Sequence, residues 1–199
     1  MGQYLQGRDP RIHLLENKEY QLGSILTLKT ALPYLDEEFF LFNADHIYPK
    51  RILPKLLAER KKITAVCDFD RPLVSDDMKI KKTPEGYLTD ISKKLTSYDG
   101  GYIGITYCEK ETLSFYKKTV EDVSKKTEGQ GVVEEVLATL IQNGNPPRTC
   151  DASGLGWLEI DTLEDLAHAE KEIKNLIDCT VSGDDGARTR NLRRDRATI

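Results

Sequence analysis

Short apolar runs of strand length recur along the chain and alternate with longer stretches that keep a helical period. The strand-like runs cover residues 11–15, 39–43, 63–69 and 101–107. Apolar residues repeat every three to four positions over residues 24–35, 49–62, 108–126 and 131–144. This alternation predicts an α/β fold in which helices cover both faces of a mainly parallel sheet.

Two segments depart from this pattern. Residues 78–95 read as two short polar strands joined around Pro84, Glu85 and Gly86, which predicts a small hairpin insertion outside the hydrophobic sheet. Residues 181–199 hold five Arg, three Asp and no Lys, and they lack apolar periodicity. We expect this tail to be disordered, and we interpret it as a non-native extension rather than a basic arm for nucleic acid.

Composition narrows the class of protein. The 199 residues are 39% hydrophobic and 31% charged, which suits one soluble globular domain. No apolar run has the length of a membrane span, and the N-terminus lacks the pattern of a secretory signal, so we expect a cytoplasmic protein. The net charge of −4 argues against a nucleic-acid partner, because phosphate contacts require clustered Lys and Arg.

The first candidate for chemistry is Asp45, which follows the apolar run 39–42 in the segment "FFLFNADHI". Ligands of open α/β sheets bind beyond the carboxyl ends of strands, so Asp45 is placed to bind a metal or a substrate. The alternative is that Asp45 caps a helix beginning near Pro49, a role that Asp often fills. The spacing is long for a cap and favours ligation.

The second candidate is "WLEIDTLEDL", residues 157–166, where four carboxylates lie among apolar residues. If residues 157–160 form a strand, Glu159 and Asp161 lie on one face near its carboxyl end. Thr162 is a plausible N-cap for a following helix, which explains Glu164 and Asp165 but leaves Glu159 and Asp161 unexplained. A hard divalent cation such as Mg²⁺ would account for these two carboxylates together with Asp45.

The motifs "LFNADHI" and "WLEIDTLEDL" resemble those of nucleotidyltransferases of the sugar-phosphate and MobA-like type. Within that superfamily the chain is similar to cytidylyltransferases that act on phosphocholine and on inositol-1-phosphate. The resemblance implies a Rossmann-like three-layer α/β fold with a mainly parallel sheet. It also implies transfer of a nucleoside monophosphate from CTP or another NTP to a small phosphate ester such as phosphocholine. Inositol-1-phosphate and sugar-1-phosphates are the alternative acceptors.

The resemblance also implies roles for particular residues. Asp45 and Asp161 would be catalytic and, with Glu159, would hold Mg²⁺. Lys93, in "ISKKL", would be a catalytic cation for the acceptor phosphate, although a solvated hairpin lysine explains it equally well. The stretch "LGSILTLKTA" would line the nucleotide base through Gly23, Ser24 and Thr27, with Ser24 where the family has Asn. A dimer is left open.

The chain departs from the family at its beginning. Family members start with a strand and a "G-x-G-x-R" loop that cradles the triphosphate, and no such loop occurs in the 199 residues. We therefore expect residues 1–180 to be a partial nucleotidyltransferase domain, a fragment that lacks the first βα units and has impaired activity. Two other hypotheses are a non-catalytic binding remnant of such an enzyme and an unrelated α/β protein whose carboxylates are surface caps.

Overall fold

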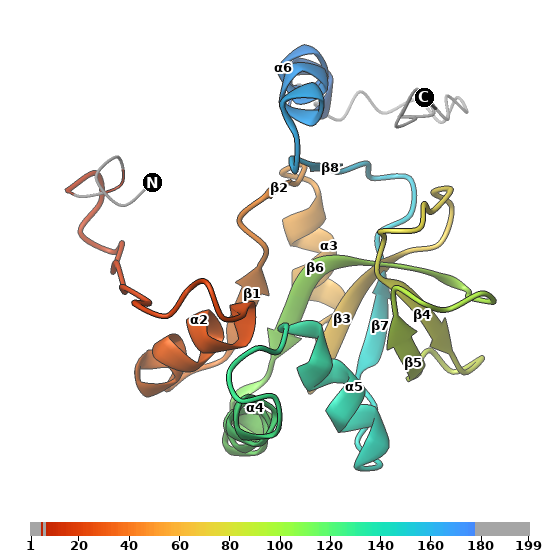
Figure 1. Ribbon diagram of the computed structural model, residues 1–199. Helices are drawn as coiled ribbons and strands as arrows, with labels where there is room; N and C mark the ends of the chain where they lie inside the picture. Colours follow the sequence, from red (N-terminus) through yellow and green to blue (C-terminus); the bar gives the residue numbers. More distant parts are fainter. Residues whose placement is uncertain (1–4, 6, 178–199) are drawn as a thin grey trace.

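Strand β6 (Gly100–Cys108) is the centre of the main sheet, and every residue along it is buried. The computed structural model describes residue 5 and residues 7–177. In this part of the chain the main sheet has six strands (Figure 1). Five of them pair in the order β5-β4-β6-β3-β7, and the sixth, β1, also pairs with β6. The other strands of the sheet are β1 (Phe39–Phe42), β3 (Ile63–Asp68), β4 (Lys79–Lys82), β5 (Leu88–Ser92) and β7 (Arg148–Asp151).

The strand directions explain where a site can form. Among the described pairs of this sheet only β3 and β7 are parallel, and all the others are antiparallel, so the expectation of a mainly parallel sheet is wrong. However, β6 runs antiparallel to both β1 and β3, which therefore point the same way as each other and as β7. Their carboxyl ends consequently meet at one edge of the sheet, which preserves the geometry that the α/β prediction relied on.

Helices cover both faces of the sheet, as the α/β pattern predicts. Helices α2 (Ser24–Ala31), α4 (Leu113–Lys126) and α5 (Glu134–Gln142) pack on one face, with short 3₁₀ turns η1 (Leu32–Tyr34) and η2 (Lys110–Thr112) beside them. Helix α3 (Ile52–Glu59) packs on the other. Strand β3 is buried on both sides, because Ala65 and Cys67 join the first core and Val66 joins the second. The result is three layers.

A small second unit adjoins the carboxyl edge. Strand β2 (His46–Ile47) pairs antiparallel with β8 (Leu158–Glu159), and α6 (Leu163–Ile177) packs beside them. In Figure 1 this unit stands above the main sheet. It has its own small apolar cluster, in which Leu158, Ala169 and Leu176 are buried. The predicted strand at 157–160 is therefore real but short, and the helix after Thr162 is confirmed.

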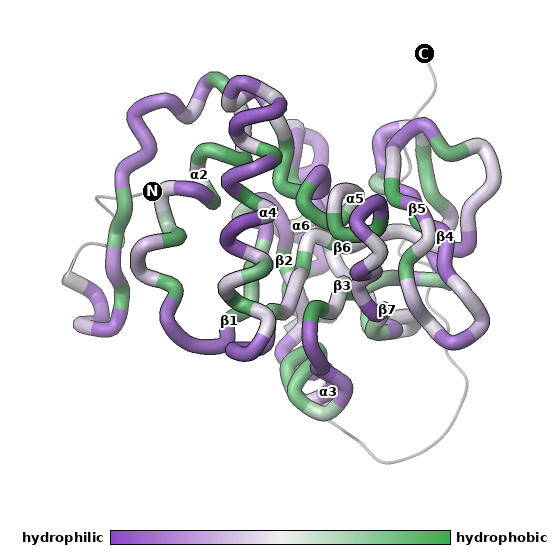
Figure 2. Tube along the Cα trace, turned by 90° about the horizontal axis from the view of Figure 1, so that it is seen from below, coloured by the Kyte–Doolittle hydropathy of each residue, from purple (hydrophilic) through white to green (hydrophobic). Residues whose placement is uncertain are grey.

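Two expectations about strands are wrong. Residues 11–15 form no strand, and in Figure 1 and Figure 2 the segment before α2 runs away from the sheet. Its apolar side chains at Ile12 and Leu14 are 40% and 46% exposed, because no sheet edge lies beside them to pair with. The hairpin of β4 and β5 exists but belongs to the main sheet, since β4 pairs with β6 and Ile80 is fully buried.

The tail from residue 181 lies outside the described residues. Among the described helices, none combines the length and the apolar character that crossing a membrane demands.

Candidate active site

A cleft of about 820 Å³ lies at the carboxyl edge of the main sheet. Its walls come from α2, from β1 and the loop after it, from the loop before β4, from Lys93 just after β5, from β6, from the start of α5 and from the junction between β8 and α6. Of the residues predicted for the site, those that line the cleft are Ser24, Thr27, Asp45, Lys93, Glu159 and Asp161. The fold therefore gathers in one hollow side chains that the sequence keeps far apart.

Gly23 is the predicted site residue that does not line the cleft. A Cβ at this position would overlap the backbone of Gln130 and Gly131, so the glycine allows α2 to pack against the loop before α5. The next residue contributes to the same junction, because the Ser24 hydroxyl accepts a hydrogen bond of 3.1 Å from the Val133 amide. Gly23 thus shapes the wall, whereas Ser24 and Thr27 form part of it.

The floor of the cleft depends on Gly104, which has a φ of +78° in the middle of β6. The Asn43 amide donates a hydrogen bond of 2.9 Å to the Gly104 carbonyl. A Cβ on Gly104 would lie 2.8 Å from the Asn43 side chain and 2.9 Å from the Tyr48 hydroxyl. Only glycine therefore allows both the backbone conformation and this close approach. Asn43 lines the cleft, although the sequence interpretation did not include it.

Asp45 is held by contacts on both sides. Its carboxylate Oδ1 lies 2.7 Å from Nδ1 of His46, and its carbonyl accepts a hydrogen bond of 2.8 Å from the Ile160 amide. The Asp45 side chain is 49% exposed, whereas that of His46 is only 6% exposed. Helix α3 begins at Ile52 with Arg51 as its N-cap residue, so the alternative in which Asp45 caps this helix is wrong.

The acidic segment after β8 is organised by a helix cap. Thr162 accepts a hydrogen bond of 3.1 Å from the Asp165 amide, and the Asp165 carboxylate accepts one of 3.0 Å from the Thr162 amide. This reciprocal pair is a capping box, and it confirms Thr162 as the N-cap residue. Because the Asp161 amide also donates to Asp165, at 3.2 Å, the cap fixes the backbone of Asp161 where it borders the cleft.

Trp157 forms a buried corner behind these carboxylates. Its indole stacks on the His46 ring with an interplanar angle of 6° and a centroid separation of 5.1 Å. The Arg71 guanidinium lies 4.1 Å from the Trp157 ring centroid, and the indole N–H donates to Asp68 at 3.0 Å. Asp68 ends β3 and is 3% exposed. The sequence interpretation missed Asp68 and Arg71, although a carboxylate at the end of a buried strand is the signal that drew attention to Asp45.

The electrostatics of the cleft are dominated by carboxylates. Burial, and then the negative charges of Asp45 and Glu159, raise the pKa of the Tyr48 phenol far above its usual value. That phenol donates a hydrogen bond of 2.7 Å to the Ile103 carbonyl, which holds the ring of Tyr48 against β6. Because the charges of Asp45 and Glu159 both raise the pKa of Tyr48, the two acidic segments lie close enough to affect the same group electrostatically.

Lys93 is the predicted cation of the cleft, and it has a partner. Its ammonium lies 3.0 Å from the Asp76 carboxylate, and both side chains are about half exposed. The hydrogen bond with Asp76 raises the pKa of Lys93, and Glu159 and Glu134 add to this effect. Burial raises the pKa of Glu134, which also lines the cleft. The sequence interpretation missed Glu134 and Asp76, since no local pattern marks either.

The carboxylates of the cleft match the ligand chemistry of Mg²⁺ but do not form a ready-made metal cluster. Among the described residues, no group of three or more His, Cys, Asp or Glu side chains is arranged to hold a metal. Asp45, Glu159 and Asp161 nevertheless line one cleft and offer only carboxylate oxygens. Mg²⁺ is usually held by one or two carboxylates together with water and substrate phosphates, so this set fits the ion chemically. The assignment of Mg²⁺ to these residues stays a prediction.

Comparisons with known proteins agree with the fold. No family model matches the chain. It is 24% identical over 192 residues to the bifunctional IPC transferase and DIPP synthase of Rubrobacter xylanophilus, which covers 95% of this chain and 42% of that protein. It is 25% identical over 149 residues to the CTP:phosphoglutamine cytidylyltransferase of Campylobacter jejuni, covering 65% of this chain and 58% of that protein.

Solved structures point the same way. The inositol-1-phosphate CTP transferase from T. maritima superposes with a TM-score of 0.66 at 22% identity, over 82% of this chain and 67% of that one. The CTP:phosphocholine cytidylyltransferase from Streptococcus pneumoniae gives a TM-score of 0.61 at 15% identity, over 79% and 67%. The chain therefore has the fold of these nucleotidyltransferases and resembles cytidylyltransferases in sequence. The chain spans 42% of the length of the Rubrobacter relative and 58% of that of the Campylobacter relative.

Proposed function

We propose that this chain provides the acceptor and metal side of a cytidylyltransferase site, which joins CMP from CTP to a small phosphate ester and releases pyrophosphate. One observation carries the proposal. The hydrogen bond from the Ile160 amide to the Asp45 carbonyl joins two acidic segments at the carboxyl edge of the sheet, in a cleft that also contains Lys93. Carboxylates and a lysine that line the same cleft suit the handling of phosphates.

In the proposed reaction a phosphate oxygen of the acceptor attacks the α-phosphorus of CTP. A new phosphorus–oxygen bond forms while the bond to the β-phosphate oxygen breaks, and the electron pair leaves with pyrophosphate. Lys93 would orient the acceptor phosphate and offset its charge. For this, its ammonium exchanges Asp76 for the phosphate, an exchange that costs little because the pair is half exposed.

The acidic side of the cleft would hold the metal ion. Asp45 and Asp161, with Glu159 nearby, are the residues that we assign to Mg²⁺. When bound, the ion supplies positive charge that neutralises the phosphates of both substrates. His46 keeps the Asp45 carboxylate in one orientation through the 2.7 Å contact with its Nδ1 atom.

On the nucleotide side of the cleft, the chain offers residues for the base but no loop for the triphosphate. Ser24 and Thr27 from α2 line it and would contact the base. The 199 residues contain no "G-x-G-x-R" loop, so we expect this chain alone to bind the triphosphate weakly and to react slowly. CTP is favoured over other nucleotides because three of the similar proteins are named for their use of CTP.

The sequence resemblance puts phosphocholine first among the acceptors, but the side chains of the cleft favour polyol phosphates such as inositol-1-phosphate, with phosphocholine second. Asn43 and Glu134 line the same cleft as Lys93, and the Asn43 side-chain carbonyl oxygen and the Glu134 carboxylate would accept hydrogen bonds from hydroxyl groups. An aromatic face suits the quaternary ammonium of choline, but Trp157 already contacts His46 and Arg71. The comparison with the T. maritima enzyme, which is named for inositol-1-phosphate, agrees with this order.

The test is a pyrophosphate-release assay with Mg²⁺, CTP and either inositol-1-phosphate or phosphocholine, beside direct binding of each substrate by calorimetry. We expect slow release with the polyol phosphate, which Asp161→Asn abolishes. Glu164→Gln is the matched control, because Glu164 lies in the first turn of α6 and does not line the cleft. If the chain binds CTP tightly but turns over no phosphate ester, the binding-remnant hypothesis replaces this proposal.

A further inference from the structure

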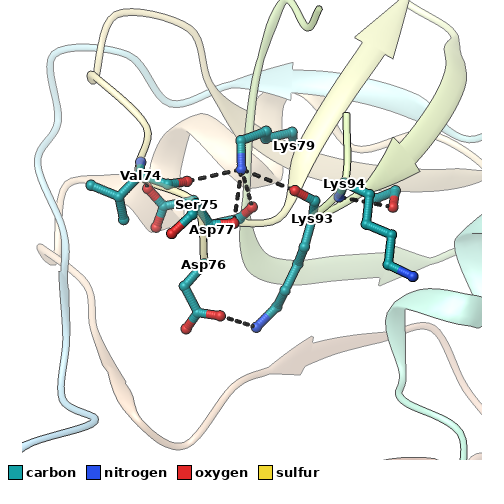
Figure 3. Close-up of polar contacts among 8 residues, drawn as sticks. Val74, Ser75, Asp76, Asp77, Lys79, Lys93 and Lys94 are labelled. Carbon is teal, nitrogen blue, oxygen red and sulfur yellow. Dashed lines mark hydrogen bonds and ion pairs between the residues drawn. The ribbon is translucent and has the colours of Figure 1, made fainter. Parts of the chain in front are cut away.

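Lys79, the first residue of β4, is a buried lysine whose ammonium is surrounded by backbone carbonyls. It is 6% exposed. Its Nζ atom lies 2.8 Å from the carbonyl oxygen of Val74, 3.1 Å from that of Ser75, 3.2 Å from that of Asp77 and 3.1 Å from that of Lys93. Figure 3 shows the amine at the centre of these four contacts.

This arrangement needs a positive charge. Burying an ammonium is unfavourable unless strong hydrogen bonds replace the water that it loses. An ammonium has three N–H donors, and four carbonyls share them here, so each carbonyl dipole also stabilises the charge electrostatically. A neutral side chain of equal length would fill the space but would leave these carbonyls without their common donor. Lys79 therefore gathers the carbonyls as a bound cation would.

The four carbonyls belong to two segments that form one wall of the cleft. Three come from the loop 74–77, and the fourth comes from Lys93, just after β5. The loop closes on itself, because the Val74 amide donates to the Asp77 carboxylate at 2.6 Å. Asp76, Asp77 and Lys93 line the cleft, whereas Lys79 does not. Lys79 thus lies behind the wall that presents Lys93 and Asp76.

We propose that Lys79 is a positioning residue for the acceptor phosphate. By binding the loop 74–77 and the Lys93 backbone at one point, it keeps Lys93 and Asp76 opposed across 3.0 Å at the cleft wall. Lys93 is then in place when a phosphate displaces Asp76. The inference rests on the proposed function, because it assigns the acceptor phosphate to Lys93.

The test uses the variant Lys79→Met, which keeps the length of the side chain but removes its charge. Calorimetry measures the affinity for inositol-1-phosphate and, separately, for CTP, with Mg²⁺ present. Affinity for the ester should fall about tenfold, while affinity for CTP should stay within about twofold. Hydrogen exchange at residues 74–77 should accelerate. Lys81→Met is the matched control, because Lys81 lies two residues further along the same strand and does not line the cleft. It should change neither affinity.

A second variant covers the case in which Lys79→Met does not fold. Lys79→Ala, purified in propylammonium, should regain affinity for the ester, because the small cation occupies the vacated space. Propanol, which is similar in size but neutral, should not restore it. A merely structural lysine would lower the affinities for CTP and for the ester alike, and that result overturns the inference.

The remaining outcomes separate this inference from the proposed function. If exchange at 74–77 accelerates in Lys79→Met but affinity for the ester is unchanged, the positioning role is wrong while the proposed function stands. Unchanged exchange also overturns the role. If the wild-type chain binds CTP but neither inositol-1-phosphate nor phosphocholine, the proposed function fails at its acceptor, and the role of Lys79 fails with it.

Discussion

The amide of Ile160 donates a hydrogen bond of 2.8 Å to the carbonyl of Asp45, and this bond joins the loop after β1 to the end of β8. The adjacent pairing of β2 with β8 places His46 opposite Glu159. Asp45 and Asp161 are therefore neighbours in space because of backbone contacts rather than any direct attraction between like charges.

Removing this hydrogen bond should weaken metal binding. Ile160→Pro eliminates the amide donor, so the two acidic segments should separate and the affinity for Mn²⁺, a spectroscopic substitute for Mg²⁺, should fall about tenfold. Electron paramagnetic resonance titration of free Mn²⁺ measures this. Ile160→Val keeps the amide and the apolar contact, and its affinity should match that of wild type. Equal affinities for the proline and valine variants would contradict the role of the bond.

Gly104 should be far more sensitive to substitution than another glycine with the same backbone conformation. Gly104→Ala combines a positive φ with overlap against Asn43 and Tyr48, so we expect a loss of about 3 kcal/mol in the free energy of unfolding. Gly154 has a φ of +73°, but a Cβ added there would meet no atom within 4 Å, so Gly154→Ala should cost only about 1 kcal/mol. Urea unfolding compares the two, and similar losses would contradict the overlap.

Stability should depend on pH through Asp70. A hydrogen bond with the buried Asp68 carboxylate raises the pKa of Asp70 to about 6, and partial burial and the charge of Asp68 add to this effect. Between about pH 4 and pH 6 the folded state therefore keeps a proton on Asp70 that the unfolded state has released. The stability that this proton contributes is complete below about pH 4 and is lost as the pH rises to about 6.

The variant Asp70→Asn should abolish this part of the pH dependence. Because the amide cannot lose a proton, the variant should gain stability relative to wild type between about pH 4 and pH 6 and keep that gain above it. Urea unfolding at a series of pH values provides the measurement. Asp36→Asn, which removes an exposed carboxylate before β1, serves as the control. If the free energies of unfolding of wild type and Asp70→Asn change in parallel with pH, the pKa of Asp70 is not raised in the folded state.

Two adjacent lysines should differ in their effect on the acceptor. Lys93 lines the cleft, and its neighbour Lys94 is exposed but does not line it. Lys93→Met should raise the KM for the phosphate ester about tenfold, since it removes the cation that faces the phosphate, and it should leave the KM for CTP nearly unchanged. Lys94→Met should resemble wild type in steady-state kinetics. Equal effects of the two variants would mean that Lys93 is a solvated surface lysine.

Local patterns in the sequence were sufficient for much of this structure. The helices, the hairpin turn and the cap at Thr162 depend on residues only a few positions apart, whose period and turn chemistry can be read directly. Local reasoning also identified Asp45, from its place beyond the end of a strand, and Glu159 and Asp161, because carboxylates in an apolar strand are costly unless they have a partner. All three line the cleft.

Only the tertiary structure decided how the strands pair and which further side chains meet at the cleft. Residues 11–15 have a strand-like composition but form no strand, because no sheet edge lies beside them. The hairpin belongs to the main sheet because β4 pairs with β6. Glu134, Asp76 and Lys79 acquire their places from contacts between distant segments. Strand pairing and burial depend on which edges and surfaces remain available once the whole chain has packed, and no local pattern of residues encodes that.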